Sequence, residues 1–248
     1  MHKNSLKMMK RAVETVEART NYKTLSVLDV GSRVVAGEGY SYFSIFQDSN
    51  HSYIGLDIEP GDNVNLVLSD PYQWVEIQSE SFDLVISGQM MEHVPLFWEA
   101  MKEVFRVTRP GGFVILVVPS KGAIHRYPVD CYRFNPDGLC ALAKWLGLNI
   151  VSLTIDSGSY WGDLVLIAHR PVGLAPIHKG NLLYELEYPL ISLSRAKRLG
   201  QIFVTLVSAT IGDNYFMRLV SVRNVVRKFL TRYAKPKVNE NERSKSLK

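Results

Sequence analysis

Leu25-Ser26-Val27-Leu28-Asp29-Val30-Gly31-Ser32 is the stretch from which the fold can best be predicted. An apolar run that contains one acid and ends in glycine is typical of a buried parallel strand followed by a sharp turn. A buried carboxylate is costly without a partner, so we expect Asp29 near the carboxyl end of its strand, where open α/β sheets bind ligands. Gly31 would let the backbone turn tightly and approach a ligand closely.

Two further apolar runs end in an acid. The run 53–57 ends at Asp57, and the run 64–70 ends at Asp70. Asp57 lies 20 residues after Gly37, the distance at which a dinucleotide-binding fold places an acid on the ribose hydroxyls. Each acid taken alone would be interpreted as a turn or cap residue, but their repeated position after apolar runs predicts a shared ligand-binding edge.

Strands alternate with helices along most of the chain. This pattern predicts an α/β fold, with a doubly wound, mostly parallel sheet of seven strands and helices on both faces. The last two strands have no helix between them, so we expect an antiparallel hairpin at one edge. The expected strands are 25–30, 53–57, 64–70, 82–88, 113–118, 149–155 and 164–168. The expected helices are 5–19, 92–108 and 136–146, with a short helix within 32–47 and a helical turn at 71–77.

The chain divides into an N-terminal helix (1–23), one large domain (24–170), a linker (171–180), a helical C-terminal region (181–234) and a disordered tail (235–248). The net charge of +5 is placed unevenly. Residues 213–248 hold ten Lys/Arg and three Asp/Glu, whereas residues 1–212 hold 19 Lys/Arg and 21 Asp/Glu. Because the main body is not basic, we expect no nucleic-acid partner.

The basic segment 213–234 has apolar residues at helical spacing: Tyr215, Leu219, Val222, Val226, Phe229 and Tyr233. A basic amphipathic helix of this kind can lie on an anionic membrane. The alternative is a helix that packs its apolar face on the body of the protein or on a second subunit in a homodimer.

The remaining composition is that of a soluble globular protein, with 46% hydrophobic and 21% charged residues. The cysteines, Cys131 and Cys140, match no metal-site spacing, so we expect no metal site, and they suit a reducing compartment. The N-terminus lacks the apolar core of a signal peptide, and no run approaches the ~18 apolar residues of a membrane span. We therefore expect a cytoplasmic location, with peripheral membrane contact through 213–234 as an addition.

Residues 24–170 resemble the class I S-adenosylmethionine-dependent methyltransferases. The resemblance is carried by Val27–Gly31, Ile54–Asp57, Ser69-Asp70, Phe82–Ser87, Glu92-His93-Val94 and Arg106–Gly112, in that order. More narrowly, the loop His125–Phe134 looks like one found in methyltransferases associated with bacterial glycan assembly. The resemblance implies a Rossmann-like methyltransferase fold and S-adenosylmethionine as the cofactor.

The resemblance also implies roles for single residues. Asp57 would accept hydrogen bonds from both ribose hydroxyls, Asp70 would face the adenine amino group, and Asp29 would help hold the ammonium of the amino-acid end. The full set of expected cofactor-binding residues is Asp29, Gly31, Asp57, Ile58, Ser69, Asp70, Gly88 and Gln89.

The first loop departs from the family pattern. Arg33 stands where the second glycine is expected, and Gly37 and Gly39 come late, so the loop is longer. The loop also counts against a nicotinamide dehydrogenase, which needs a G-x-G-x-x-G turn to bind a pyrophosphate. Gly37 and Gly39 match the first two glycines of that motif, but Tyr42 stands at the position of the third. A non-catalytic binding module that has lost cofactor binding is the alternative that Arg33 favours.

Catalysis is expected to rest mainly on positioning, since methyl transfer is an in-line displacement. A hydroxyl acceptor must also lose its proton, and His93 and His125 are the candidate bases. The alternative roles are local packing for His93 and an ion-pair network for His125.

The candidate acceptor-binding residues are Arg126, Asp130 and Arg133. The arginines suit an anionic acceptor such as a sugar phosphate or uronate, although either arginine could instead pair with Asp130. The expected acceptor is a glycan or lipid-linked intermediate or another small molecule, with a lipid or quinone as the alternative.

Overall fold

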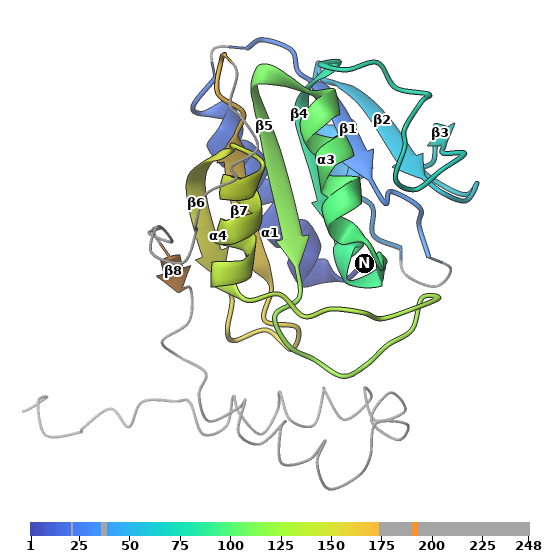
Figure 1. Ribbon diagram of the computed structural model, residues 1–248, viewed down its shortest axis with the longest axis vertical. Coiled ribbons are helices and arrows are strands. Elements are labelled where there is room, and N and C mark those ends of the chain that lie inside the picture. Colours follow the sequence, from blue (N-terminus) through green and yellow to red (C-terminus); the bar gives the residue numbers. More distant parts are fainter. Residues whose placement is uncertain (21, 36–38, 174–189, 193–248) are drawn as a thin grey trace, which may run out of the picture. The chain divides into compact units, whose positions relative to one another are not determined.

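Two central strands, β1 (Ser26–Val30) and β4 (Phe82–Gly88), pair in parallel in the computed structural model (Figure 1). The structure describes residues 1–20, 22–35 and 39–173, together with the backbone of 190–192. All of these lie in one compact unit, Met1–Lys197. Strands β1 and β4 are buried along nearly their whole length, as their apolar sequences predict.

The sheet has the order β3-β2-β1-β4-β5-β7-β6-β8. From β1 the chain adds strands outward on one side and then crosses to β4, so the order reverses between β1 and β4. Ligands of open α/β sheets bind outside the carboxyl ends of the strands at such a switch point. The remaining strands are β2 (Ser52–Asp57), β3 (Leu66–Val67), β5 (Thr108–Val118), β6 (Asn149–Ile155), β7 (Leu164–His169) and β8 (Leu190–Ser192).

The predicted mostly parallel sheet with an antiparallel hairpin is confirmed. Strands β1 to β5 pair in parallel, and β7 pairs antiparallel with both β5 and β6. The seven expected strands are all present, and β8 adds an eighth that pairs in parallel with β6. Residues 190–192 were expected within a helical region, so that part of the prediction is wrong.

Helices cover both faces of the sheet (Figure 1), as expected of a doubly wound fold. Helices α1 (Lys3–Glu17) and α2 (Phe43–Phe46) pack on one face, and α3 (Phe97–Val107) and α4 (Pro136–Trp145) pack on the other. Side chains of β5 alternate between the two cores. Ile115 and Val117 join the core under α1, whereas Val114 and Leu116 join the core under α3 and α4.

The predicted helix 92–108 is divided in two. A 3-10 turn, η1 (Met91–His93), is followed by an extended Val94 and then by α3. Pro95 explains the break, because the residue before a proline is pushed away from helical geometry. The break leaves Glu92 and His93 on a short turn beyond the end of β4.

Two further predictions need correction. The helical turn expected at 71–77 is reduced to one turn, in which the Ile77 amide bonds to the Trp74 carbonyl. The buried Trp74 instead ties this loop to α3, because its backbone amide donates to Glu103 at 3.0 Å. Strand β3 has only two residues, whereas seven were expected. Strand β5 begins at Thr108, five residues before the expected start at 113, and its pairing with β4 is irregular around Asp83.

Several predictions lie outside the described residues. They are the helical region 181–234 apart from 190–192, the tail 235–248, the amphipathic segment 213–234, most of the linker 171–180, and Gly37. Among the helices that are described, none has both the length and the apolar character to cross a membrane.

Candidate functional site

Two glycines lie at the switch point, at the ends of β1 and β4. Gly31 has a φ of +79°, a left-handed conformation that favours glycine, and a Cβ there would lie 2.5 Å from Cγ of Met90. A Cβ on Gly88 would lie 1.9 Å from the Tyr42 hydroxyl. Both positions therefore require glycine, because neighbouring side chains pack directly against the backbone.

Asp29 is buried at the same place, with 1% of its surface exposed. Its Oδ2 atom accepts a hydrogen bond of 2.5 Å from the Tyr53 hydroxyl, but no described residue donates to Oδ1. Burial raises the pKa of Asp29 to about 7. A buried carboxylate oxygen without a donor fits a ligand that brings one, such as an ammonium group.

Asp57 ends β2, one strand away. Its Oδ1 accepts from the amides of Ile58 and Glu59, at 2.8 and 3.3 Å, and its Oδ2 accepts from the amide of Arg33 at 3.1 Å. A carboxylate has about four acceptor positions, so one remains for a ligand in this arrangement. Hydrogen bonds from both ribose hydroxyls, as the resemblance implies, would require the Arg33 amide to give way.

Arg33 itself holds the turn after β2. Its guanidinium pairs with Glu59 at 2.7 Å and lies 5.7 Å from the centre of the Tyr127 ring. The residue that departs from the family pattern thus bridges the first loop and the loop after β5.

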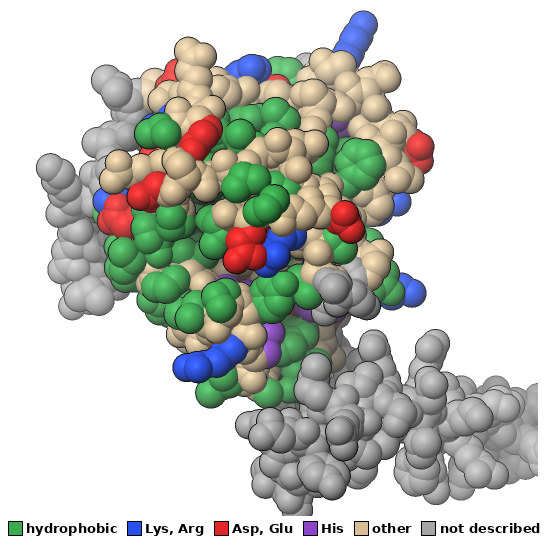
Figure 2. Space-filling view, turned by 90° about the vertical axis from the view of Figure 1, so that its right-hand side faces the viewer, with side chains coloured by type: hydrophobic (Ala, Val, Ile, Leu, Met, Phe, Trp, Pro, Cys, Tyr) green, Lys and Arg blue, Asp and Glu red, His purple; other side chains and the backbone are tan. Residues whose placement is uncertain are grey.

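The other expected cofactor-binding residues lie beyond the ends of β2, β3 and β4. Asp70 accepts from the amides of Tyr72 and Gln73, the cap role that was its alternative interpretation. Ser69 is exposed, and its amide donates to Glu76. Ile58 is apolar yet 54% exposed, as a residue that packs on a planar ligand would be. Figure 2 faces the β2–β3 edge of the sheet, where hydrophobic side chains reach the surface among polar ones. The exposed apolar residues of β2, its following turn and β3 are Ile54, Ile58 and Val67.

Helix α1 also contributes to this end of the sheet, which the sequence did not indicate. Ser5 bonds to Tyr42 at 2.5 Å, and Tyr42 in turn packs on Gly88. Asn4 donates to the fully buried Asp163 at 2.6 Å, and Gln89 donates to the same carboxylate at 3.2 Å. The one signal that could have identified Asp163 is an acid placed directly before the apolar run of β7.

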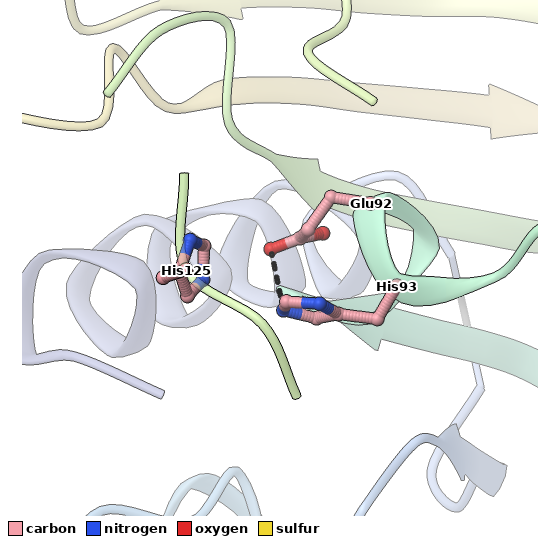
Figure 3. A group of neighbouring side chains, drawn as sticks. All are labelled: Glu92, His93 and His125. Atoms are coloured by element: carbon pink, nitrogen blue, oxygen red, sulfur yellow. Dashed lines mark ion pairs between the residues drawn. The ribbon is translucent and has the colours of Figure 1, made fainter. Parts of the chain in front are cut away.

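Beyond the ends of β4 and β5, Glu92, His93 and His125 come together (Figure 3). Glu92 and His93 come from η1, and His125 comes from the loop after β5. The two imidazole rings are 4.9 Å apart between centres, and His93 Nε2 lies 3.8 Å from Glu92 Oε1. Both candidate bases are thus placed side by side, and the sequence did not single out Glu92 as a site residue.

The loop 120–135 is held by one buried ion pair. Arg133 binds Asp130 through both terminal nitrogens, at 2.5 and 2.8 Å, and also donates to the Ala123 carbonyl at 2.7 Å. Burial opposes ionisation of Asp130, but the hydrogen bonds from Arg133 and from the His125 amide lower its pKa to about 2. The alternative interpretation of Arg133, pairing with Asp130, is what the structure shows. Arg126 is exposed, and no described residue forms an ion pair with it.

Comparison with known proteins identifies relatives of the segment that runs from β1 to β5. Residues 28–116 match the family described as a methyltransferase domain. An uncharacterized methyltransferase of Mycobacterium avium is 33% identical over 101 residues, which cover 37% of this chain and 38% of that protein. The chain therefore aligns with well under half the length of the curated relatives that it matches.

Solved structures share the fold at low sequence identity. The 1,6-didemethyltoxoflavin-N1-methyltransferase of Burkholderia thailandensis, solved with its substrate and S-adenosylhomocysteine, has a TM-score of 0.52 and 17% identity, over 66% of this chain and 78% of that chain. The CurJ carbon methyltransferase has a TM-score of 0.54 and 13% identity, over 67% of this chain and 54% of that chain. At these identities the likeness shows the Rossmann-like methyltransferase fold of the domain.

Proposed function

We propose that this protein is an S-adenosylmethionine-dependent methyltransferase. The observation that carries the proposal is the buried Oδ1 of Asp29, which no described residue satisfies, at the switch point of a sheet with the methyltransferase fold. The family match over 28–116 supports it, because that segment extends from β1 to β5 and includes Asp29, Asp57 and Asp70.

The cofactor is S-adenosylmethionine, which supplies a methyl group on a positively charged sulfur. Asp29 holds the ammonium of its amino-acid end, and Asp57 accepts a hydrogen bond from its ribose. Ile58, whose side chain is exposed, would pack on the adenine, and Gly31 would let the backbone come close to the cofactor. The chain's own contribution to the reaction is alignment of the acceptor with the methyl group.

The acceptor is an oxygen of a glycan or another sugar-containing molecule. The proposal is supported by the side chains that gather around the loop 120–135. Arg126 offers an exposed positive charge, and Trp161 and Tyr160 place two aromatic rings 4.8 Å apart next to His125. These groups suit an anionic acceptor that also presents an apolar face.

A lipid or quinone acceptor is the second candidate. It is favoured by Ile124, which lies in the same loop and is 78% exposed. The basic segment 213–234 would then hold the enzyme at an anionic membrane surface, through roughly 1 kcal/mol of attraction per basic residue.

The test is transfer of a labelled methyl group from S-adenosylmethionine to fractionated cell extract. The full-length protein should label a polar, acid-hydrolysable sugar fraction, whereas the lipid alternative predicts label in the chloroform-soluble fraction. The Asp29→Asn variant should lower the labelling at least tenfold, and Asp48→Asn, which changes an exposed acid after α2, should not. Labelling that is equal in wild type and Asp29→Asn would contradict the proposal, and so would its absence from all fractions.

A further inference from the structure

Glu92 is a buried acid without a hydrogen-bond partner. None of its surface is exposed, and neither carboxylate oxygen accepts a hydrogen bond from a described residue. A buried carboxylate of this kind is expensive unless something satisfies its oxygens, and a bound cation is one way of doing so.

His93 is oriented as a metal-binding histidine would be. Its Nδ1 hydrogen-bonds to the Val129 carbonyl, which can only accept, so the proton of the neutral ring lies on Nδ1. The other nitrogen, Nε2, is then an available lone pair and lies 3.8 Å from Glu92 Oε1 (Figure 3). Histidines that bind metals commonly donate their second N–H to a backbone carbonyl or a carboxylate.

His125 completes the group from the opposite side. Its Nδ1 lies 3.4 Å from Oδ2 of Asp130 and 3.3 Å from Nη2 of Arg133, which can only donate. Binding of a metal ion through Nε2 therefore requires the Nδ1 proton to face the Asp130 carboxylate while Nη2 of Arg133 keeps its other acceptors, the Ala123 carbonyl and Asp130. Arg133 holds Asp130 in place through two hydrogen bonds and therefore fixes the position of the carboxylate beside His125.

The three side chains offer ligand atoms that all lie within 4.8 Å of one another. In the tetrahedral geometry usual for zinc, with bonds of about 2.0–2.2 Å, two ligand atoms lie roughly 3.4 Å apart. Closure of the group around an ion therefore needs the most distant ligand atoms to approach each other by up to about 1.4 Å.

We propose that Glu92, His93 and His125 bind a divalent transition-metal ion of the zinc type. Two imidazoles and one carboxylate form a donor set that such ions take, and this set replaces our expectation from the sequence that no metal site is present. Three protein ligands leave a coordination position open, and an oxygen atom of an acceptor is the kind of ligand that it would take. Binding of the ion itself does not depend on the proposed methyl transfer.

The test uses the full-length protein, free of any histidine tag and dialysed against a chelator. Co²⁺ is titrated as a visible probe, and Zn²⁺ is then added to displace it. We expect saturation at one Co²⁺ per chain, with an absorption spectrum that lacks the intense thiolate band that Cys131 would produce. Glu92→Gln, His93→Gln and His125→Gln should each weaken binding at least tenfold.

Two matched variants control for other sites. His51 pairs with Glu17 at 2.9 Å, away from this group, and Cys131 is exposed next to Asp130 in the sequence. His51→Gln and Cys131→Ser should bind Co²⁺ as the wild type does. As a readout that needs no variant, Zn²⁺ should raise the midpoint of thermal unfolding of the wild type.

The proposal is overturned if the wild type shows no saturable binding, or if all the variants bind equally well. Titration of the chelator-treated protein with S-adenosylmethionine tests the proposed function separately. Cofactor binding without metal binding would reject the metal site alone, and metal binding without cofactor binding would reject the methyltransferase alone.

Discussion

The Tyr53 hydroxyl donates its proton to Oδ2 of Asp29 across the neighbouring strands β2 and β1. Asn63 Nδ2, which can only donate, contacts the same hydroxyl at 2.9 Å, so the hydroxyl accepts from Asn63 and its proton is available to Asp29. Oδ2 of Asp29 is thus satisfied within the protein, and Oδ1 is left for a ligand. The sequence suggested a functional acid here but contained no sign that Tyr53 would orient it.

The buried Asp29 should make folding stability depend on pH. Its pKa is raised from 3.8 to about 7, so between these values the folded protein keeps a proton that the unfolded chain has released. The free energy of unfolding should therefore fall as the pH rises from about 4 to about 7, and it should change no further above that. The contribution is at most roughly 4 kcal/mol.

Urea unfolding of the wild type and of Asp29→Asn, at half-unit steps from pH 4.5 to 8, checks this prediction. The difference in free energy between the two proteins should grow with pH and then level off. Taking the difference also removes the contribution of Glu92, which is common to both. Parallel curves would show that Asp29 ionises in the folded protein as it does in the unfolded chain.

Gly88→Ala should destabilise the protein. The added methyl group would lie 1.9 Å from the hydroxyl of the buried Tyr42 and 2.6 to 2.7 Å from its ring, and overpacking of this kind costs about 1–3 kcal/mol. Gly138→Ala is the matched control, because Gly138 lies in α4 with nothing within 4 Å of its Cβ position. That variant should be up to about 1 kcal/mol more stable, since alanine is the better helix former. Thermal unfolding would measure both, and equal effects would contradict the packing described for Tyr42.

The two arginines of the loop 120–135 should respond differently to substitution. Arg133→Ala leaves the buried Asp130 unpaired and should cost about 3 kcal/mol in the free energy of unfolding. Arg126→Ala should leave stability unchanged, because Arg126 is exposed, and should raise the KM for the acceptor if Arg126 binds it. Urea unfolding measures the structural role of Arg133, and acceptor kinetics measure the binding role of Arg126. A stability loss of the same size in both variants would contradict this division of roles.

The parts of the fold that depend on apolar periodicity could be predicted from the sequence. The bounds of β4 and β6 agree with the expected strands, because each is a continuous run with clear turn residues at its ends. The helical turn at 71–77 failed because Trp74 is drawn into the core and its amide bonds to Glu103, 29 residues later in the chain. Local propensity contains no information about such a contact.

The site could be predicted only where a residue's position in a strand determines its role. Asp29 and Asp57 lie at strand ends, and strand ends can be read from one sequence. The cluster of Glu92, His93 and His125 depends on how the loop 120–135 folds back over η1. The Cys131 amide bonds to the Glu92 carbonyl at 2.7 Å, across a separation in sequence that no local pattern spans.

The central claim, that S-adenosylmethionine binds at the β1–β4 switch point, is tested most directly by calorimetric titration of the full-length protein with this cofactor. We predict one site per chain, with affinity weakened at least tenfold in Asp29→Asn and in Asp57→Ala, because each loses a charge-assisted hydrogen bond of about 1.5–3 kcal/mol. Asp48→Asn, which changes an exposed acid outside the proposed site, should bind normally. Absence of binding, or wild-type affinity in both aspartate variants, would contradict the account.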